Sequence, residues 1–314
     1  MKPKIIFFGT PSFAVGILDL IYSEQYIIDA VVTSPDRKSG RGRKINFSPI
    51  KDFCIDKKIK LYQPENLKDE SFITKLKNHN SDIFIVVAFR MIPKIVWSIP
   101  KKGTFNLHAS LLPNYRGAAP INWAIINQEK ITGVTTFLID EKIDTGKILL
   151  KGDYKIHINE TYDSLHDKLL NISKPIVIET IKKLHKGKSI PVKQNNNSLI
   201  KSAPKLTKQN TKINWNKSIN EIIFFINGLN SYPGAWTNVT NQKSIQSIKI
   251  FESDFEYSKH KYRDNELIVL NKKIKISHKE GFLILKNLQL PNKKRLSDIE
   301  LLNGFTFEKG VFVS

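Results

Sequence analysis

The sequence predicts an α/β protein: a doubly wound, mainly parallel sheet of the Rossmann-like type, followed by a smaller C-terminal β-barrel. Short apolar runs first alternate with segments of helical period, then a polar stretch breaks the pattern, and several short strands follow. A chain of 314 residues is long enough for two such domains. We expect an α/β domain over residues 1–189, a linker over 190–208 and an OB-like barrel over 209–314.

The first strand is predicted over residues 4–9, where an apolar run ends at Gly9. A helix follows, because apolar residues recur at helical spacing from Phe13 to Ile21. The apolar run over 82–88 predicts a strand buried on both faces. Other strands are expected over 27–33, 103–108, 134–139 and 147–150, with helices near 49–58, 69–78 and 120–127. Ligands bind at the carboxyl ends of strands in such sheets.

A long helix is predicted over 161–186, with a kink or a break at Pro175. Residues 187–209 are rich in Asn, Gln and Pro, which is typical of a linker. A short helix is expected over Ile219 to Leu229. The strands that follow predict a small barrel of the oligonucleotide-binding type, and they span 236–239, 245–251, 266–270, 273–277 and 282–288.

The chain is strongly basic, with 50 Lys plus Arg against 29 Asp plus Glu and a formal net charge of +21. Such a charge attracts polyanions, although a chain rich in Lys, Ile and Asn throughout could reach it by compositional drift. Residues 1–200 hold 31 basic and 19 acidic residues, and residues 201–314 hold 19 and 10. Positive charge is therefore denser in the C-terminal part, which favours a nucleic-acid partner.

Several classes of protein are not expected. The single cysteine, Cys54, allows neither an internal disulfide nor a multi-cysteine zinc site, and it fits a reducing cytoplasmic setting. No apolar run approaches the roughly 18 to 20 residues of a membrane helix, and the initial run is too short for a signal peptide. The segment that begins at Gly9 lacks the second and third glycines of a dinucleotide-binding fingerprint. Two domains and no obvious hydrophobic face favour a monomer. Neither a metal nor a membrane partner is expected, since the sequence shows no metal cluster and no membrane helix.

Three polar residues carry the candidate chemistry. Asn106 and His108 lie two apart on a predicted strand, so their side chains face the same way, and Asp144 follows in an Asp-Thr-Gly turn. Together they supply an oxyanion donor, a titratable group and a carboxylate that can orient it or stabilise its charge. This set predicts acyl-type transfer without a covalent intermediate. A structural histidine and a simple turn aspartate are the alternatives.

A basic segment follows the second strand. Residues 35–44 hold five basic side chains and two glycines, and four of these side chains are candidate phosphate ligands: Arg37, Arg41, Arg43 and Lys44. The segment is either a solvated loop or an arm that grips a phosphate backbone. On the predicted barrel, a second basic track comprises Lys272, Lys273, Lys275, Lys279, Lys293, Lys294 and Arg295.

These motifs resemble the methionyl-tRNA formyltransferases, a family of folate-dependent formyltransferases, along nearly the whole chain. The matching motifs are Phe8-Gly9-Thr10-Pro11, Pro35-Asp36-Arg37, Gly40-Arg41-Gly42, Asn106-Leu107-His108, Ser110-Leu111-Leu112-Pro113, Arg116-Gly117-Ala118-Ala119-Pro120, Asp144-Thr145-Gly146 and Pro233-Gly234-Ala235-Trp236. Two departures lie near the expected folate pocket: Ala109 stands where many members have Gly, and Phe89-Arg90 replaces a common Tyr-Gly.

The resemblance implies transfer of a formyl group from 10-formyltetrahydrofolate to the amino group of initiator methionyl-tRNA. It places Asn106, His108 and Asp144 at the catalytic positions, and Ser110, Leu111, Leu112 and Pro113 at the folate contact. It also implies that Arg41 and its neighbours reach the tRNA acceptor end. Asn106 and a protonated His108 would donate to the formyl oxygen as its charge grows.

Two other functions remain open from the sequence. One is a formyltransferase that acts on a small amine such as a nucleotide sugar, for which the arginine-glycine loop and the basic barrel would be unnecessary. The other is a nucleic-acid-binding module whose folate-like domain is inactive; the intact Asn106, His108 and Asp144 argue against it.

Overall fold

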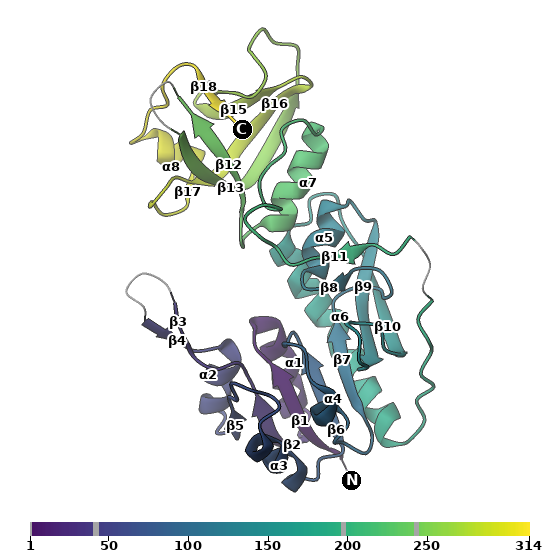
Figure 1. Ribbon diagram of the computed structural model, residues 1–314. Helices are drawn as coiled ribbons and strands as arrows, with labels where there is room; N and C mark the ends of the chain where they lie inside the picture. Colours follow the sequence, from purple (N-terminus) through teal and green to yellow (C-terminus); the bar gives the residue numbers. More distant parts are fainter. Residues whose placement is uncertain (1, 40–43, 196–198, 242–244) are drawn as a thin grey trace. The chain divides into compact units, whose positions relative to one another are not determined.

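The computed structural model describes residues 2–39, 44–195, 199–241 and 245–314 (Figure 1). The chain divides into two compact units whose segments interleave in sequence. The first contains Met1–Gly117, Ile131–Tyr154 and His166–Ser202, and the second contains Ala118–Lys130, Lys155–Leu165 and Ala203–Ser314. The linear boundaries expected at 189 and 209 stay a prediction. Two short segments of the expected α/β domain group with the C-terminal part in the second unit.

The first unit is built on a seven-stranded sheet, of which five neighbouring strands run parallel and one, β9, is antiparallel to β7. This confirms the mainly parallel α/β prediction. In spatial order the strands are β10 (Ile148–Lys155), β9 (Ile131–Leu138), β7 (Thr104–His108), β6 (Ile83–Val87), β1 (Lys4–Gly9), β2 (Ile27–Val32) and β5 (Leu61–Tyr62). Figure 1 shows helices on both faces of this sheet.

Two helices of this part of the chain, α2 and α3, begin at a side-chain N-cap. Ser48 accepts a hydrogen bond from Lys51 N before α2, and Asp69 accepts one from Phe72 N before α3. The long helix α6 runs unbroken through Pro175, so of the predicted kink or break the break is wrong, while the kink stays a prediction. The helices of this part of the chain are α1 (Ser12–Ser23), α2 (Pro49–Asp56), α3 (Glu70–Asn78), α4 (Lys94–Trp97) and α6 (Tyr162–His185).

The core of the first unit follows from the doubly buried strands. Residues Ile5 to Phe8 of β1 are fully buried, and alternate side chains serve opposite faces of the sheet. On one face, the rings of Phe8 and Phe84 lie 5.4 Å apart within a cluster that includes Phe72 and Leu76 of α3. Parallel pairing of β6 with β7 holds the carboxyl ends of these two strands side by side.

Two short strands follow β2 that the sequence did not predict. Residues of β3 (Arg37–Ser39) pair antiparallel with β4 (Lys44–Asn46), so the basic segment is a β-hairpin in its described part. A second short pair is formed by β8 (Arg116–Gly117) and β11 (Ser202–Ala203).

The second unit contains an antiparallel barrel, closed by the pairing of β13 with β16. Its six strands in spatial order are β13 (Ile245–Tyr257), β12 (Ala235–Thr240), β18 (Val311–Val313), β14 (Glu266–Leu270), β15 (Lys273–His278) and β16 (Gly281–Gln289). The small barrel is therefore confirmed. The last strand, β18, and the short β17 (Leu296–Ser297) are additions to the five predicted strands.

Two capped helices accompany the barrel. Ser218 and Glu221 form a capping box at the start of α7 (Ile219–Leu229), whose buried face joins the barrel core. Ser297 opens α8 (Asp298–Leu302) in the same way. In α5 (Pro120–Ile126), Asn122 donates from Nδ2 to Gly228 O at 2.8 Å and so ties α5 to α7.

Along the described part of the chain, no helix has both the length and the apolarity to cross a membrane.

We predict that Phe84→Ala lowers the free energy of unfolding by about 3–5 kcal/mol, because it leaves a cavity in the doubly buried strand β6. Urea denaturation followed by circular dichroism measures this. Ile55→Ala on α2 is the control: its side chain is 59% exposed, so its effect should stay within about 0.5 kcal/mol. Equal losses in the two variants would contradict the assigned core.

Candidate active site

Asn106 and His108 lie at the carboxyl end of β7, between β6 and β9. Leu107 between them is buried in the opposite direction, as strand alternation requires. The Asn106 side chain is half-buried, and among the described residues its amide has no hydrogen-bond partner. An amide left free beside an imidazole is available to a ligand.

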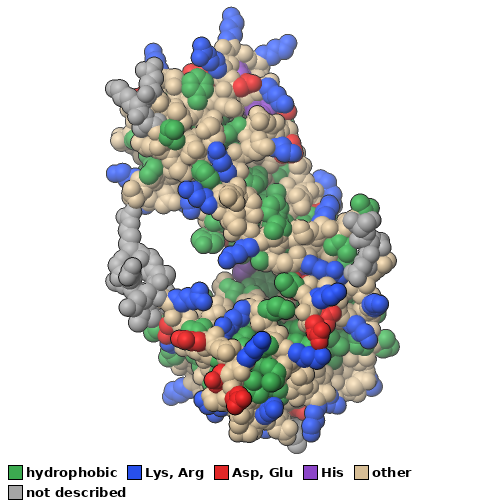
Figure 2. Space-filling model, viewed as in Figure 1, with side chains coloured by type: hydrophobic (Ala, Val, Ile, Leu, Met, Phe, Trp, Pro, Cys, Tyr) green, Lys and Arg blue, Asp and Glu red, His purple; other side chains and the backbone are tan. Residues whose placement is uncertain are grey.

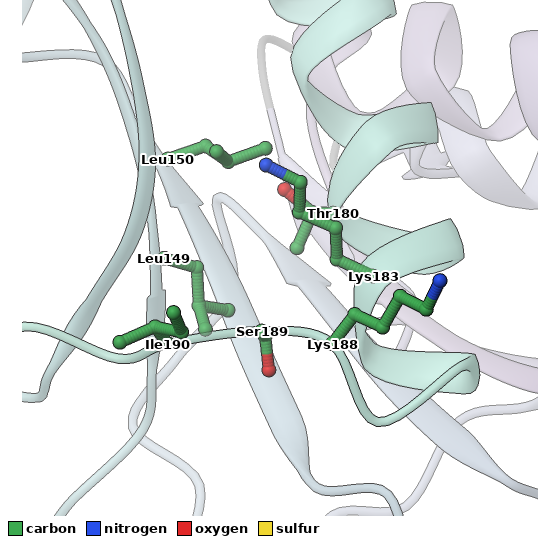
Figure 3. A pocket seen from close by; sticks show the side chains of 7 residues that line it. All are labelled: Leu149, Leu150, Thr180, Lys183, Lys188, Ser189 and Ile190. Atoms are coloured by element: carbon green, nitrogen blue, oxygen red, sulfur yellow. The ribbon is translucent and has the colours of Figure 1, made fainter.

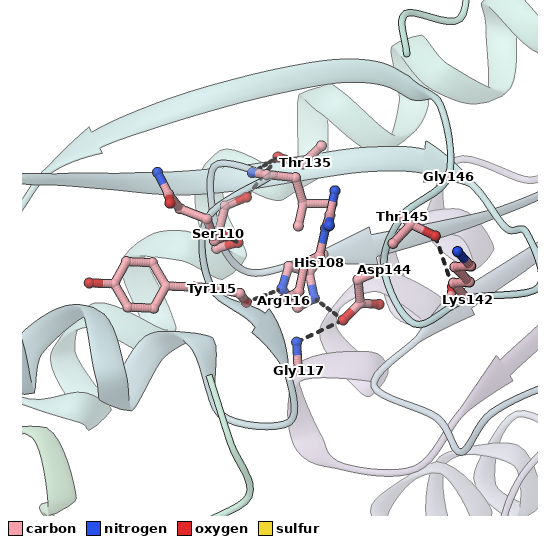
Figure 4. Close-up of polar contacts among 12 residues, drawn as sticks. His108, Ser110, Tyr115, Arg116, Gly117, Thr135, Lys142, Asp144, Thr145 and Gly146 are labelled. Carbon is pink, nitrogen blue, oxygen red and sulfur yellow. Dashed lines mark hydrogen bonds and ion pairs between the residues drawn. The ribbon is translucent and has the colours of Figure 1, made fainter. Parts of the chain in front are cut away.

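His108 is 7% exposed, and its two ring nitrogens have different partners (Figure 4). Nε2 lies 2.8 Å from the carbonyl oxygen of Tyr115. Because a carbonyl can only accept, Nε2 carries a hydrogen in this arrangement. Nδ1 faces Asp144 Oδ2 at 3.8 Å, which is too long for a direct hydrogen bond. A water oxygen or a ligand atom that forms hydrogen bonds with both Nδ1 and Oδ2 can bridge that distance.

Asp144 is held by its backbone and by its carboxylate. Its φ of 54° is in the left-handed region, which aspartate tolerates better than most residues. Oδ2 accepts a hydrogen bond from Gly117 N at 2.9 Å. In the same turn, Thr145 Oγ1 donates to Asp140 Oδ1 at 2.7 Å. The predicted turn thus exists and aims the carboxylate at His108.

Side-chain hydrogen bonds from β9 and β10 hold the backbone of the Ser110 to Pro113 segment. Thr135 Oγ1 donates to Ser110 O at 2.7 Å and accepts from Leu112 N at 3.1 Å, while Lys151 Nζ donates to Leu112 O at 2.5 Å. The buried Ser110 hydroxyl donates to Asn114 O at 2.7 Å. Leu112 is also buried, so Leu111, Pro113 and the remaining backbone groups are the parts open to a ligand.

The two departures from the family pattern are accommodated locally. The Phe89 ring packs edge-on against Phe8 at 5.7 Å. Arg90 donates from Nη1 to Glu65 O at 2.8 Å and from Nη2 to Pro64 O. Ala109 is half-buried directly after His108. None of these residues displaces the Asn106–His108–Asp144 set.

The basic segment is anchored at its base. The Asp36 carboxylate accepts from Lys51 Nζ at 2.5 Å and from Gln63 Nε2 at 2.8 Å, and these bonds hold the pKa of Asp36 below its usual range. Arg37 begins β3 and is exposed, and Lys44 begins β4. Arg41 and Arg43 lie outside the described residues.

Cys54 does not offer a nucleophile. Burial raises the pKa of its thiol to about 12, so the thiol stays protonated near neutral pH. Nor do three or more His, Cys, Asp or Glu side chains gather in a metal-binding arrangement anywhere in the described ranges.

Sequence reasoning missed the supports of the site. Gln194, placed in the expected linker, is 5% exposed and binds both Arg116 and the backbone of the Asp144 turn. Thr135 and Lys151 support the Ser110 segment from β9 and β10. No local pattern marks these residues, since their roles depend on contacts with distant parts of the chain.

A separate cavity of about 130 Å³ lies between β10, the C-terminal half of α6 and the segment after it (Figure 3). It shares no residue with the candidate site. Its lining comprises Leu149, Leu150, Thr180, Lys183, Lys188, Ser189 and Ile190.

With this geometry established, comparison with known proteins decides the family. The formyl transferase family model matches residues 3–181, and the model of the formyl transferase C-terminal domain matches residues 205–306. A methionyl-tRNA formyltransferase of Flavobacterium johnsoniae is 52% identical over 98% of this chain and 97% of its own length. One from Clostridioides difficile is 40% identical over 98% of this chain and 99% of its own length.

The chain belongs to the methionyl-tRNA formyltransferase family. The resemblance inferred from the sequence motifs is thereby confirmed.

Solved structures show the same fold. HypX from Aquifex aeolicus, in complex with tetrahydrofolic acid, matches with a TM-score of 0.66 at 17% identity over 96% of this chain and 47% of that one. This formyltransferase chain thus spans about half the length of HypX. WlaRD, a sugar 3N-formyl transferase, matches with a TM-score of 0.61 at 26% identity over 94% of this chain and 100% of that one.

We predict that Gly146→Ala displaces the Asp144 turn, because an added Cβ would lie 1.6 Å from Leu138 O. Overpacking of this kind costs about 1–3 kcal/mol, which should lower the unfolding temperature by several degrees. Differential scanning calorimetry measures the shift. Gly304→Ala is the matched control, since a Cβ there meets nothing within 4 Å. An unshifted transition in Gly146→Ala would show that the turn can relax.

Proposed function

We propose that this chain transfers the formyl group of 10-formyltetrahydrofolate to the amino group of initiator methionyl-tRNA, which supplies formylmethionyl-tRNA for translation initiation. The observation that carries the proposal is the Asn106 amide beside the His108–Asp144 pair at the end of β7, an amide with no hydrogen-bond partner in the part of the chain that the structure describes. The names of the relatives at 52% and 48% identity support the same reaction and substrate.

The donor set fits a folate formyl donor. A formyl oxygen needs N–H donors, and Asn106 Nδ2 and a ring nitrogen of His108 are N–H groups at one strand end. The backbone after His108 is held rigidly by Thr135 and Lys151, which suits a contact surface for a flat ligand. When bound, 10-formyltetrahydrofolate would supply an activated formyl carbon for attack by the methionyl amine.

The arrangement specifies which proton His108 would donate. The Nε2–H group already donates a hydrogen bond to Tyr115 O. A hydrogen bond to the formyl oxygen would therefore be donated by Nδ1–H of a protonated ring. Asp144 faces this nitrogen at 3.8 Å and compensates the positive charge of that form. The same carboxylate can accept the proton that leaves the attacking amine, through one bridging water.

The residues contribute by electrostatics and by positioning. Asn106 and His108 stabilise the oxygen that gains charge, and each such donor contributes about 100- to 1,000-fold in rate. Holding the amine and the formyl carbon together supplies much of the remaining acceleration. Ser110, Leu111, Leu112 and Pro113 form the proposed folate contact. Because the Ser110 hydroxyl is used internally, the proposed contact is through Leu111, Pro113 and the backbone.

The charge of the chain fits the tRNA part of the proposal. Figure 2 shows Lys and Arg side chains spread over the face in view, with few acidic ones between them. Arg37, Arg41, Arg43 and Lys44 of the basic segment are the proposed contacts to the acceptor end. A cytoplasmic location is part of the proposal, since aminoacylated tRNA is a cytoplasmic substrate. A monomeric state is also part of it, because the sequence shows no obvious hydrophobic face.

We predict that His108→Ala lowers kcat for formyl transfer by about 100- to 1,000-fold, with little change in tRNA affinity. Quench-flow formylation assays and filter binding measure the two quantities. His157→Ala, which removes an exposed histidine, is the control and should keep both values. Equal loss of binding and turnover would contradict the assigned role.

The same assay separates the competing functions. Purified protein is offered methionyl-initiator tRNA, methionyl-elongator tRNA or a nucleotide-linked amino sugar. Fast transfer to the initiator tRNA alone supports the proposal. Transfer to the sugar alone would move the substrate to a small amine, and salt-sensitive RNA binding without any transfer would indicate a binding module.

We predict that Arg41→Ala raises KM for methionyl-tRNA several-fold and lowers the slope of log K against log salt by about one, because one phosphate contact is lost. Titrations of tRNA binding between about 50 and 200 mM salt measure the slope. Lys77→Ala, on the exposed side of α3, is the charge-matched control. If both variants behave alike, the basic segment is only a solvated surface segment without a tRNA contact.

A further inference from the structure

The segment between α6 and β11, expected to be a linker, lies against the site. Val192 pairs with Ile148 of β10 through two backbone hydrogen bonds, each 2.8 Å long. Two residues later, Gln194 is buried, while its neighbours Lys193 and Asn195 are exposed. A single polar side chain is therefore directed from a surface segment into the protein.

The Gln194 amide uses its whole hydrogen-bonding capacity. Nε2 donates to Asp144 O at 2.9 Å and to Gly146 O at 2.8 Å. Oε1 accepts from Arg116 Nε at 3.1 Å and Nη2 at 2.6 Å. If the amide were flipped, its NH₂ group would face the N–H groups of Arg116 and its oxygen would face the two carbonyl oxygens. Only the unflipped orientation therefore satisfies every group.

Arg116 stands between the two backbone groups that position the catalytic pair. Its predecessor, Tyr115, presents the carbonyl that accepts from His108 Nε2. Its successor, Gly117, presents the N–H that binds Asp144 Oδ2. Gln194 thus links Arg116, which lies between these two residues in the sequence, to the backbone of Asp144. The segment also binds Tyr115 directly, since Lys201 O accepts from Tyr115 N at 2.6 Å.

We infer that Gln194 is a positioning residue that sets the spacing between His108 and Asp144 by clamping the Asp144 turn to Arg116. The inference rests on the proposed function for its kinetic consequences. An apolar side chain of similar size would remove the donors from the carbonyls of Asp144 and Gly146 and one acceptor from the Arg116 guanidinium, so packing alone does not explain an amide here. A shift of about 1 Å in such a pair can cost about 100-fold in rate.

The test begins with the unliganded protein. Gln194→Glu keeps the length and an acceptor for Arg116, but it loses both N–H donors and places an oxygen against two carbonyls. Hydrogen exchange of peptides covering residues 139–148, followed by mass spectrometry, should become at least about fivefold faster, since the turn loses its clamp. Asn195→Asp is the matched control, an exposed amide changed to an acid at the adjacent position. It should leave the exchange unchanged.

Kinetics then separate positioning from general stability. In Gln194→Glu and Gln194→Ala, kcat for formyl transfer should fall about 10- to 100-fold, while KM for both substrates stays within about twofold. In an Asp144→Asn background, Gln194→Ala should cost less than about twofold, because its effect acts through the Asp144 carboxylate.

Three outcomes would overturn the inference. Unchanged exchange and unchanged kcat would show that Gln194 positions nothing. An undiminished loss in the Asp144→Asn background would show an effect independent of that carboxylate. Exchange that rises over the whole first unit would mean a general loss of folding. If wild-type protein transfers no formyl group, the proposed function fails, and the exchange measurement still decides whether Gln194 holds the turn.

Discussion

The hydrogen bond from His108 Nε2 to the carbonyl of Tyr115 is the interaction on which the site depends. It sets the tautomer of the neutral ring, and it leaves Nδ1 as the nitrogen that faces Asp144. The roles proposed for Asn106 and Asp144 follow from that choice. The bond exists because the turn after Pro113 brings Tyr115 back over the end of β7, and Lys201 O holds that turn from the other side.

The parallel sheet makes this bond possible. Strands β6 and β7 are buried, so their carboxyl ends sit side by side with little freedom. A half-buried amide and a buried imidazole at this edge are costly unless partners satisfy them. His108 has its partners within the chain, whereas the Asn106 amide has none among the described residues. That difference marks Asn106 as the group most directly available to a substrate.

Much of the fold was predictable because its signals are local. The capping box at Ser218 and Glu221 defines the start of α7, and the Leu270–Lys273 turn separates β14 from β15 at nearly the expected residues. The short β17 and β18 were missed because two or three residues carry no period. Of the kink or break expected at Pro175, the break was wrong: the helix continues past the missing N–H, and Ser173 and Thr180 donate to carbonyls within it.

By itself, the sequence determined the α/β class, the barrel and the family, and it predicted the Asn106–His108–Asp144 set, because strand period, motif spacing and residue chemistry are properties of short stretches. Only the tertiary structure decided which nitrogen of His108 is occupied, how the Asp144 turn is held, and that Gln194 of the expected linker is bonded to this turn. The physical reason is separation along the chain. Gln194 lies 50 residues from Asp144 and 78 from Arg116, and hydrogen bonds over such separations leave no local pattern in the sequence.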